Sequence, residues 1–424
     1  MPHPRPTALH RRRKATWPNR GLAVALAGGG ALLGWWLPRA ERSHSLGGLT
    51  YDPATAQATL GAIAAGAITL TGFVLTAVTL VIQSVQSMSP RLAGVLGYFE
   101  RSLVLFGALT GTAVYTLVVL AQVREDHAPR LSVTLAIVFV VLSTAAILRS
   151  FAGLRDLVTG GGLVRAVGQL LHTALDHEWH DPQTPPSSTG PTLLPHTDTD
   201  TDTAEIPAPY GGIVQHIDAP AIMAVAGRLD LHVTCLVAVG SFVEPGAPLL
   251  RVSPATSDAT VRSLTRAVRL GPARRIDHDP AYGLRLLVDV AIRALSPAVN
   301  DPTTAVQALD QIESALLRLA HRTLGTIVFR NEDGTDRLTL SRPDWHALLD
   351  LALAEIVLYG ADSLQVHRRL RALLAALACT LPSHRATSLT PFRATLDHTV
   401  RALPTPALTD IAAIEDPQGL GGPA

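Results

Sequence analysis

Four long apolar blocks near the start of the chain constrain its fold more than any other sequence feature. The blocks span residues 21–37, 58–82, 103–122 and 131–148. A helix that crosses a membrane needs about 20 mostly apolar residues, and the last three blocks meet that length. Charged residues make up 16% of the 424, against about 25% in soluble domains. The sequence therefore predicts a multi-pass α-helical membrane domain with four transmembrane helices over 20–150, after a basic tail over 1–19.

The first block is the shortest, so a cleaved signal peptide is the alternative to a retained helix. Its basic start, residues 11–14, suits both interpretations. The block ends in Trp35-Trp36-Leu37-Pro38, which is not a small-residue cleavage site. Paired tryptophans at the end of an apolar run are typical of an interfacial anchor. We therefore predict that this helix is retained.

Basic residues indicate how the helices are oriented. Those on one predicted side are Arg5, Arg11, Arg12, Arg13, Lys14, Arg20, Arg91, Arg101, Arg149, Arg155 and Arg165. The other side holds Arg39, Arg42, Arg124 and Arg130. Because basic loops stay in the cytoplasm, we expect a protein of the plasma (inner) membrane with both termini cytoplasmic. Its lipid partner is the bilayer, and the arginine-rich, alanine-rich composition indicates a GC-rich, bacterial genome.

A polar stripe runs along the second predicted helix at steps of three or four residues, which places it on one face. The stripe consists of Ala62, Gly66, Thr69, Gly72, Thr76, Thr79, Gln83 and Gln86. It is either a packing seam, within the bundle or between subunits of a homo-oligomer, or the lining of an aqueous path. The predicted pore or helix-packing face comprises Thr69, Thr76, Thr79 and Gln83. No Asp, Glu, Lys or Arg lies deep in any block, which argues against an ion-coupled carrier but permits an uncharged pore.

Composition and motifs exclude several classes of protein. The formal net charge is +1, which gives no basic surface for nucleic acid. Two cysteines cannot build a disulfide framework or a zinc ribbon, and the chain has no P-loop, GxSxG or HExxH motif. His172, Asp176 and His180 share a helix face, but histidines near a helix end are more often solvated. The sequence therefore predicts no enzyme, cofactor, metal site or nucleic-acid partner.

A cytoplasmic α+β region follows the membrane domain. We expect an amphipathic connector helix over 151–180, a disordered linker over 181–209, a small β-barrel- or sandwich-like module over 210–255, a mainly helical domain with a short β-hairpin over 256–405, and a flexible tail over 406–424. The module contains a "VGxxVxxGxPL" stretch over 239–249 that looks like a lipoyl-type barrel-sandwich. This stretch has no lysine, so it cannot carry lipoate or biotin.

Two helices in this region carry the same start signal, an Asp N-cap followed by Pro. They begin at Asp279-Pro280 and Asp301-Pro302, and the turn between them reads RALSPAVNDPTTA over 293–305. This turn resembles the hallmark of the bacterial domain-of-unknown-function 2254 family of predicted membrane proteins. SMSPRL (87–92), GGIVQHID (211–218) and DPAYGLRLLVDVAIRALSP (279–297) agree with it. The resemblance implies a multi-pass membrane protein and no assigned activity; the Thr/Asp-rich linker and a short first loop depart from it.

The turn has a structural and a functional interpretation. Asp301 as a helix cap, with Ser296 and Asn300 bonding the turn backbone, explains the motif without a ligand. Alternatively, the turn is a small polar pocket for an anion at the helix N-terminus, joined by Arg275 or Arg293, or for a divalent cation on Asp279, Asp289 and Asp301. The candidate ligand-binding residues are Asp279, Asp289, Arg293, Ser296, Asn300, Asp301 and Thr304.

Three functional classes remain for the whole chain. The first is a channel or permeation protein with a cytoplasmic regulatory domain. The alternative is a membrane-anchored sensor or scaffold whose SPAVNDP turn binds a ligand or partner. An enzyme is the weakest class, because no nucleophile–base set is evident; His278, beside Asp277 and Asp279, is the best acid–base candidate.

Overall fold

The computed structural model describes residues 16–43, 50–88, 91–92, 98–124, 128–158, 161–179, 203–331, 333–401 and 404–420. The chain divides into two compact units, Met1–Leu163 and Val164–Ala424. They are called the N-terminal and the C-terminal unit.

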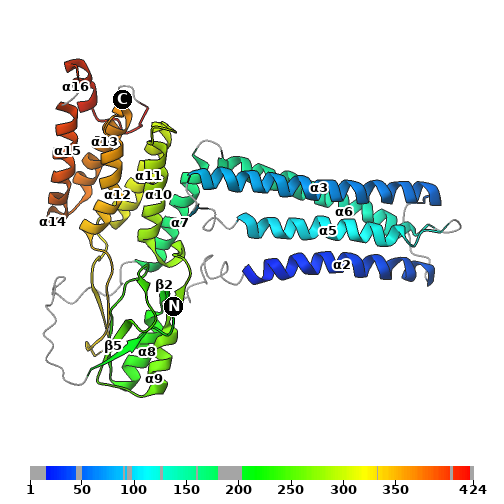
Figure 1. Ribbon diagram of the computed structural model, residues 1–424, viewed down its shortest axis with the longest axis horizontal. Coiled ribbons are helices and arrows are strands. Elements are labelled where there is room, and N and C mark those ends of the chain that lie inside the picture. The colour runs from blue at the N-terminus through cyan, green and yellow to red at the C-terminus, as the bar shows by residue number, and fades with distance from the viewer. Residues whose placement is uncertain are drawn as a thin grey trace. The chain divides into compact units, whose positions relative to one another are not determined.

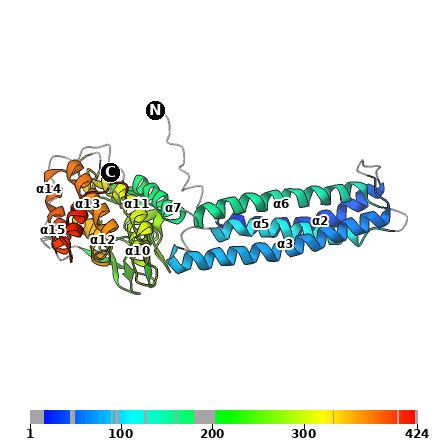
Figure 2. The ribbon, with the colours of Figure 1, turned by 90° about the horizontal axis from the view of Figure 1, so that it is seen from above.

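The N-terminal unit is a bundle of four long helices (Figures 1 and 2). They are α2 (Thr16–Ser43), α3 (Pro53–Met88), α5 (Tyr98–Leu120) and α6 (Arg130–Val158). Each contains a stretch long and apolar enough to cross a membrane, of 19 to 34 residues. The prediction of four long apolar helices is therefore confirmed. The 34-residue stretch of α3 is about 51 Å long at 1.5 Å per residue, against a hydrocarbon core of roughly 30 Å in a typical bilayer.

Helix α5 is the centre of the bundle and packs against α2, α3 and α6. Its contact with α2 is close because glycines face the other backbone. A Cβ on Gly111 would lie 2.5 Å from the Leu26 carbonyl oxygen, and one on Gly30 would collide with the carbonyl oxygen of Gly111. Gly107 meets Ala23 in the same way. The GxxxG spacing of Gly107 and Gly111 therefore closes an intrachain helix pair, as small residues do in lipid.

Polar side chains at one end of the bundle satisfy one another. The Glu41 carboxylate, near the end of α2, accepts hydrogen bonds from the backbone N–H groups of Leu131 (3.1 Å) and Ser132 (2.7 Å) and so caps α6. Gln122 Nε2 donates to the Gly34 carbonyl at 2.7 Å, and Arg39 donates to Gln122 Oε1 at 2.9 Å. These bonds fix the ends of three helices to each other.

The β part of the C-terminal unit consists of two sheets. The strands are β1 (Ala204–Pro207), β2 (Gly212–Ile217), β3 (His232–Cys235), β4 (Phe242–Val243), β5 (Pro248–Ser253), β6 (Val268–Gly271), β7 (Ile327–Arg330) and β8 (Asp336–Leu340). One sheet has the order β1-β5-β3-β8-β7 and the other β4-β2-β6; β3 and β8 are parallel, and the other pairs are antiparallel. Helices α8 (Ala219–Leu229) and α9 (Asp258–Ala267) complete one apolar core with both sheets.

Strand pairing crosses the predicted boundary of the β module at residue 255. Strand β6 and the β7–β8 hairpin lie in the segment predicted to be a mainly helical domain with a short hairpin, yet β6 pairs with β2 and β8 pairs with β3. Two parallel strands need a long connection between them. For β3 and β8 this connection is the whole stretch of chain that separates them. Strand β1 lies inside the segment predicted to be a disordered linker. It is ordered there because its residue Ile206 is buried in the apolar core. Residues 180–202 of that linker are outside the described part. Among described strands, no pairing closes the sheets into a barrel.

The remaining helices lie in the same unit as α10 (Pro280–Ala294), which is buried along most of its length. They are α7 (Gly162–Glu178), the 3₁₀ turn η1 (Ile276–His278), α11 (Pro302–Leu319), α12 (Trp345–Tyr359), α13 (Leu364–Thr380), α14 (Ser383–Ala386), the 3₁₀ turn η2 (Thr387–Leu389), α15 (Thr390–Arg401) and α16 (Pro406–Ala413). Helices α11 and α12 flank α10, and α13 packs on α11 (Figure 1).

Two further expectations need correction. The connector over 151–180 is not one helix: α6 runs to Val158 and α7 begins at Gly162, with Gly161 in the left-handed region at φ 73°. The glycine triplet thus separates two helices. The predicted flexible tail contains α16, which packs on α13. Ala412 and Asp416 there are buried.

Candidate functional site

The polar stripe of α3 lies on the side of the helix opposite its packed residues. The buried side chains of α3 are Ala56, Leu60, Ala64, Ala67, Val74, Val78 and Val85. Thr69, Thr76, Thr79 and Gln83 are all exposed. At about 100° per residue, the two sets are centred on roughly opposite faces.

Within the described part of the bundle, the stripe is therefore no packing seam. Cβ atoms on Gly66 and Gly72 would meet nothing within 4 Å. The hydroxyls of Thr69 and Thr76 donate to the carbonyls four residues earlier, at 2.9 and 3.0 Å. Each hydroxyl keeps an acceptor lone pair, so this face can meet water or the polar face of another helix. Large apolar side chains, Phe73 among them, flank the stripe and are exposed.

The SPAVNDP turn is held by its own backbone. Ser296 Oγ donates to the Arg293 carbonyl at 2.7 Å, and the Ser296 carbonyl accepts the N–H of Asn300 at 2.9 Å. The N–H of Asp301 donates to the Ala294 carbonyl at 2.8 Å. Asn300 is left-handed, at φ 47°, a conformation that Asn tolerates better than most residues.

Asp301 caps α11. Its carboxylate accepts the N–H of Thr304 at 3.1 Å and the Thr304 hydroxyl at 2.5 Å. Asp279 caps α10 in the same way, accepting the N–H of Tyr282 at 3.0 Å. Both Asp-Pro signals therefore correspond to real helix starts, and the structural interpretation of the turn accounts for these contacts.

The other acidic candidates are engaged in ion pairs. Asp279 is 4% exposed and pairs with Arg274 at 2.8 Å. Burial raises the pKa of Asp279 above its ordinary value, although the Arg274 charge opposes this. Asp289 lies 2.7 Å from Arg285, which also pairs with Glu355.

The predicted ligand residues do not come together. Asp279 precedes α10 and Asp301 follows it, and a 15-residue helix separates them by about 22 Å at 1.5 Å per residue. Asp289 lies between them on the helix. Arg293 is exposed, while Ser296, Asn300, Asp301 and Thr304 share the turn. The three carboxylates therefore do not form a single cation pocket.

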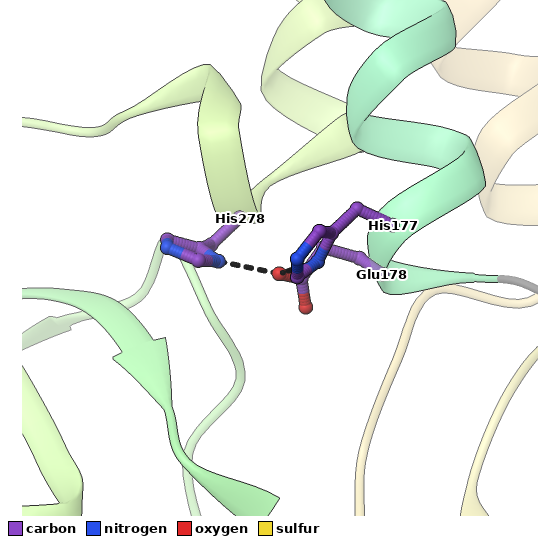
Figure 3. Close-up of side chains that lie close together, drawn as sticks. All are labelled: His177, Glu178 and His278. Atoms are coloured by element: carbon purple, nitrogen blue, oxygen red, sulfur yellow. Dashed lines mark hydrogen bonds and ion pairs between the residues drawn. The ribbon is translucent and has the colours of Figure 1, made fainter. Parts of the chain in front are cut away.

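A second cluster, which the sequence does not reveal, lies where α7 ends. His177 and Glu178 are the last residues of α7, and His278 comes from η1. Figure 3 shows the two imidazoles facing the carboxylate. His278 Nδ1 is bonded to Glu178 Oε1, and His177 Nδ1 lies 3.3 Å from the same oxygen. One ligand atom from each side chain lies within 4.8 Å of the others.

A fourth side chain, His216 of β2, packs against His278, with ring centroids 4.0 Å apart and the ring planes inclined at 39°. The carboxylate of Glu178 is thus surrounded by imidazoles. Burial by itself raises the pKa of Glu178, but the hydrogen bond from His278 and the positive charge of the histidines outweigh it, so the net pKa is below the ordinary value. Arg342, whose own pKa is lowered by burial, also acts on this carboxylate. Glu178 is therefore ionised at neutral pH.

The neighbouring carboxylates form ion pairs with arginines outside the cluster. Asp277 pairs with Arg275 at 3.0 Å, and Asp279 pairs with Arg274. Asp176, which shares a predicted helix face with His172, pairs instead with Arg318 and Arg322. His180, the third member of that face, lies outside the described residues. Of the cluster, the sequence singles out only His278, because nothing local indicates which distant residues meet it.

Comparison with known proteins identifies the chain's relatives. A family model described as "Predicted membrane protein (DUF2254)" matches residues 13–376. Uncharacterised proteins of Mycobacterium tuberculosis and Mycobacterium bovis are each 32% identical to the chain over 219 residues. The match covers 50% of this chain and 39% of each relative. No solved structure matches it.

Proposed function

The chain belongs to the DUF2254 family of predicted membrane proteins, and on that premise we propose that several copies form a permeation path across the membrane. In this proposal the polar face of α3 lines the path. The C-terminal unit lies in the cytoplasm and regulates passage. The main support for this proposal is that the hydroxyl and amide side chains of α3 lie on the face opposite the residues that pack against the other helices.

The position of this face supports an oligomer. A polar face in contact with lipid alone gains nothing from its free lone pairs, whereas water or another helix can bond them. A path shared between copies places Thr69, Thr76 and Gln83 along one line, because they recur every seven residues.

The chemistry of the face suits small polar solutes. Hydroxyls and amides both donate and accept hydrogen bonds, so they replace part of a solute's hydration without holding it strongly, as conduction requires. The face has no carboxylate or ammonium, which fits passive passage rather than ion-coupled transport.

Cysteine labelling tests this assignment. In a background in which Cys235 and Cys379 are replaced by Ala, single cysteines are placed at Thr69, Thr76 and Gln83 in protein reconstituted in liposomes. A membrane-impermeant thiol reagent should label these positions. Phe73→Cys, on the lipid-facing flank, is the matched control and should react much more slowly. Protection at all three positions, with disulfide cross-links between copies, identifies a dry subunit seam and refutes the path.

A sensor or scaffold is the second candidate, and the exposure of the turn favours it. Residues Pro297 to Asn300 are all exposed, with Val299 at 48%, while the polar ends of the turn are bonded within the chain. The turn therefore presents a small apolar tip on a rigid base, which suits a protein partner. A photo-crosslinking residue at Val299 should capture a partner in intact cells; the same residue at exposed Val328 is the control. Capture at neither position, or equally at both, removes this support.

A further inference from the structure

We propose that His177, Glu178 and His278 bind one divalent transition-metal ion of the zinc class in the C-terminal unit. This inference is independent of the permeation path. It rests on the convergence of three side chains from two elements, with ligand atoms within 4.8 Å of one another (Figure 3).

The distances suit a shared ion. Zinc binds imidazole nitrogen and carboxylate oxygen at about 2.0–2.2 Å in tetrahedral geometry, which places ligand atoms roughly 3.3–3.5 Å apart. His177 Nδ1 and Glu178 Oε1 already lie 3.3 Å apart. His278 Nδ1 is closer to that oxygen, as a hydrogen bond requires, and small side-chain rotations open this gap to admit the ion.

The donor set selects the class of metal. Two imidazoles and one carboxylate suit zinc, cobalt, nickel or copper, whereas magnesium and calcium prefer several oxygen ligands. The adjacent acidic residues cannot convert the site to an oxygen cage, because Asp277 and Asp279 are paired with arginines. Three protein ligands leave a fourth position for water.

Burial and charge also fit a bound ion. The side chains of Glu178 and His278 are 18% and 17% exposed, and that of His177 is 38% exposed, so the site is partly enclosed yet reachable from solvent. His216 packs on His278 and restricts its ring, which orients the ligand. Arg342 adds a positive charge near Glu178, so the affinity is lower than that of a site with an isolated carboxylate.

A hydrogen-bonded His–Glu pair without metal is the competing explanation. It accounts for the contacts of both His278 and His177 with Glu178 Oε1 as a hydrogen bond and an ion pair, so metal binding has to be measured directly. The metal explanation uses all three groups and fastens the end of α7 to η1.

Cobalt binding to the full-length protein tests the site. The protein is purified in detergent through a tag without histidines, stripped with chelator and titrated with Co²⁺. The parent should bind one ion per chain at this site and develop the visible d–d bands of tetrahedral cobalt. Zn²⁺ should displace the ion and abolish the bands.

Three variants and one control assign the ligands. His177→Gln, Glu178→Gln and His278→Gln should each weaken Co²⁺ binding roughly tenfold or more, since even loss of a supporting residue around a metal costs about 10–100-fold. His321→Gln, an exposed histidine outside the cluster, should leave the titration unchanged. Absence of tetrahedral bands in the parent, or bands that persist in the ligand variants, overturns the proposal. His177 is the most exposed of the three, so His177→Gln decides the matter if another variant unfolds.

Discussion

Replacing Asp301 by Ala tests whether the SPAVNDP turn is a structural device. Asp301 accepts the N–H of Thr304 at 3.1 Å and also the Thr304 hydroxyl. Loss of such a cap costs about 1 kcal/mol, and loss of a negative charge at a helix N-terminus costs a further ~0.3–1 kcal/mol. The Thr304 hydroxyl is half-buried and can bond water instead. We therefore expect Asp301→Ala to lower the free energy of unfolding by about 1.5 kcal/mol.

Two matched variants separate the contributions. Asp301→Asn keeps an oxygen acceptor for the cap and loses only the charge, so its cost should be about 0.5 kcal/mol. Asp344 caps α12 in the same way, since its carboxylate accepts the N–H of Ala347 at 2.8 Å. Asp344→Ala removes both this cap and a negative charge at the helix N-terminus, so it should also cost about 1.5 kcal/mol.

Urea titration of the full-length protein in detergent measures these values. Trp179 and Trp345 are both buried in the C-terminal unit and report its unfolding once Trp17, Trp35 and Trp36 are replaced by Phe. With an m-value of about 3 kcal/mol/M in urea, about 1.5 kcal/mol moves the midpoint by about 0.5 M. The reasoning is refuted if Asp301→Ala unfolds at the same midpoint as the parent while Asp344→Ala shows its expected shift.

Three other perturbations have defined outcomes. Gly111→Leu should force α2 and α5 apart, because a Cβ there already meets the Leu26 carbonyl at 2.5 Å. Its thermal unfolding in detergent should come at lower temperature. Gly29→Leu, on an exposed side of α2 where a Cβ meets nothing within 4 Å, should leave the unfolding temperature unchanged. Arg369→Met should lower the free energy of unfolding, measured by urea titration, by about 2 kcal/mol. Its buried guanidinium pairs with two acidic side chains of α11. One of these is nearly half exposed, so the cost is smaller than is usual for breaking a buried pair. Burial lowers the pKa of His367 in the folded protein. As pH falls below about 6.5, the imidazole is therefore protonated in the unfolded chain before it is protonated in the folded one. The stability contributed by neutral His367 should be complete above that pH and decrease below it. His367→Gln should make this decrease less steep in denaturation curves between about pH 7.5 and 5.5.

Features encoded by neighbouring residues could be predicted from the sequence. The four membrane helices follow from the length of their apolar blocks, and the starts of α10 and α11 follow from Asp279-Pro280 and Asp301-Pro302. In each case the physical cause lies within a few residues, as hydrophobic length, a cap or a fixed φ angle.

Features that depend on distant partners could not be predicted. Strand β8 pairs with β3 although the whole stretch from Cys235 to Asp336 separates them. No local sequence pattern shows which strand will be a given strand's neighbour. The cluster of His177, Glu178 and His278 could not be predicted for the same reason. In the sequence, His177 and Glu178 look like the solvated end of a helix, and nothing local shows that η1 lies beside them. The stripe on α3 can be recognised in the sequence, but only the positions of the buried residues show that it faces away from its own bundle.

Flux through liposomes tests the proposed permeation path most directly. Purified protein is reconstituted beside a Thr76→Leu/Gln83→Leu variant and a Phe73→Leu control, and release of small polar solutes and ions is followed. The proposal predicts release through the parent and the control, and loss of release in the double variant at equal protein incorporation. No release through the parent across different solutes, ions, voltages and membrane tensions, or equal release through the double variant, contradicts it.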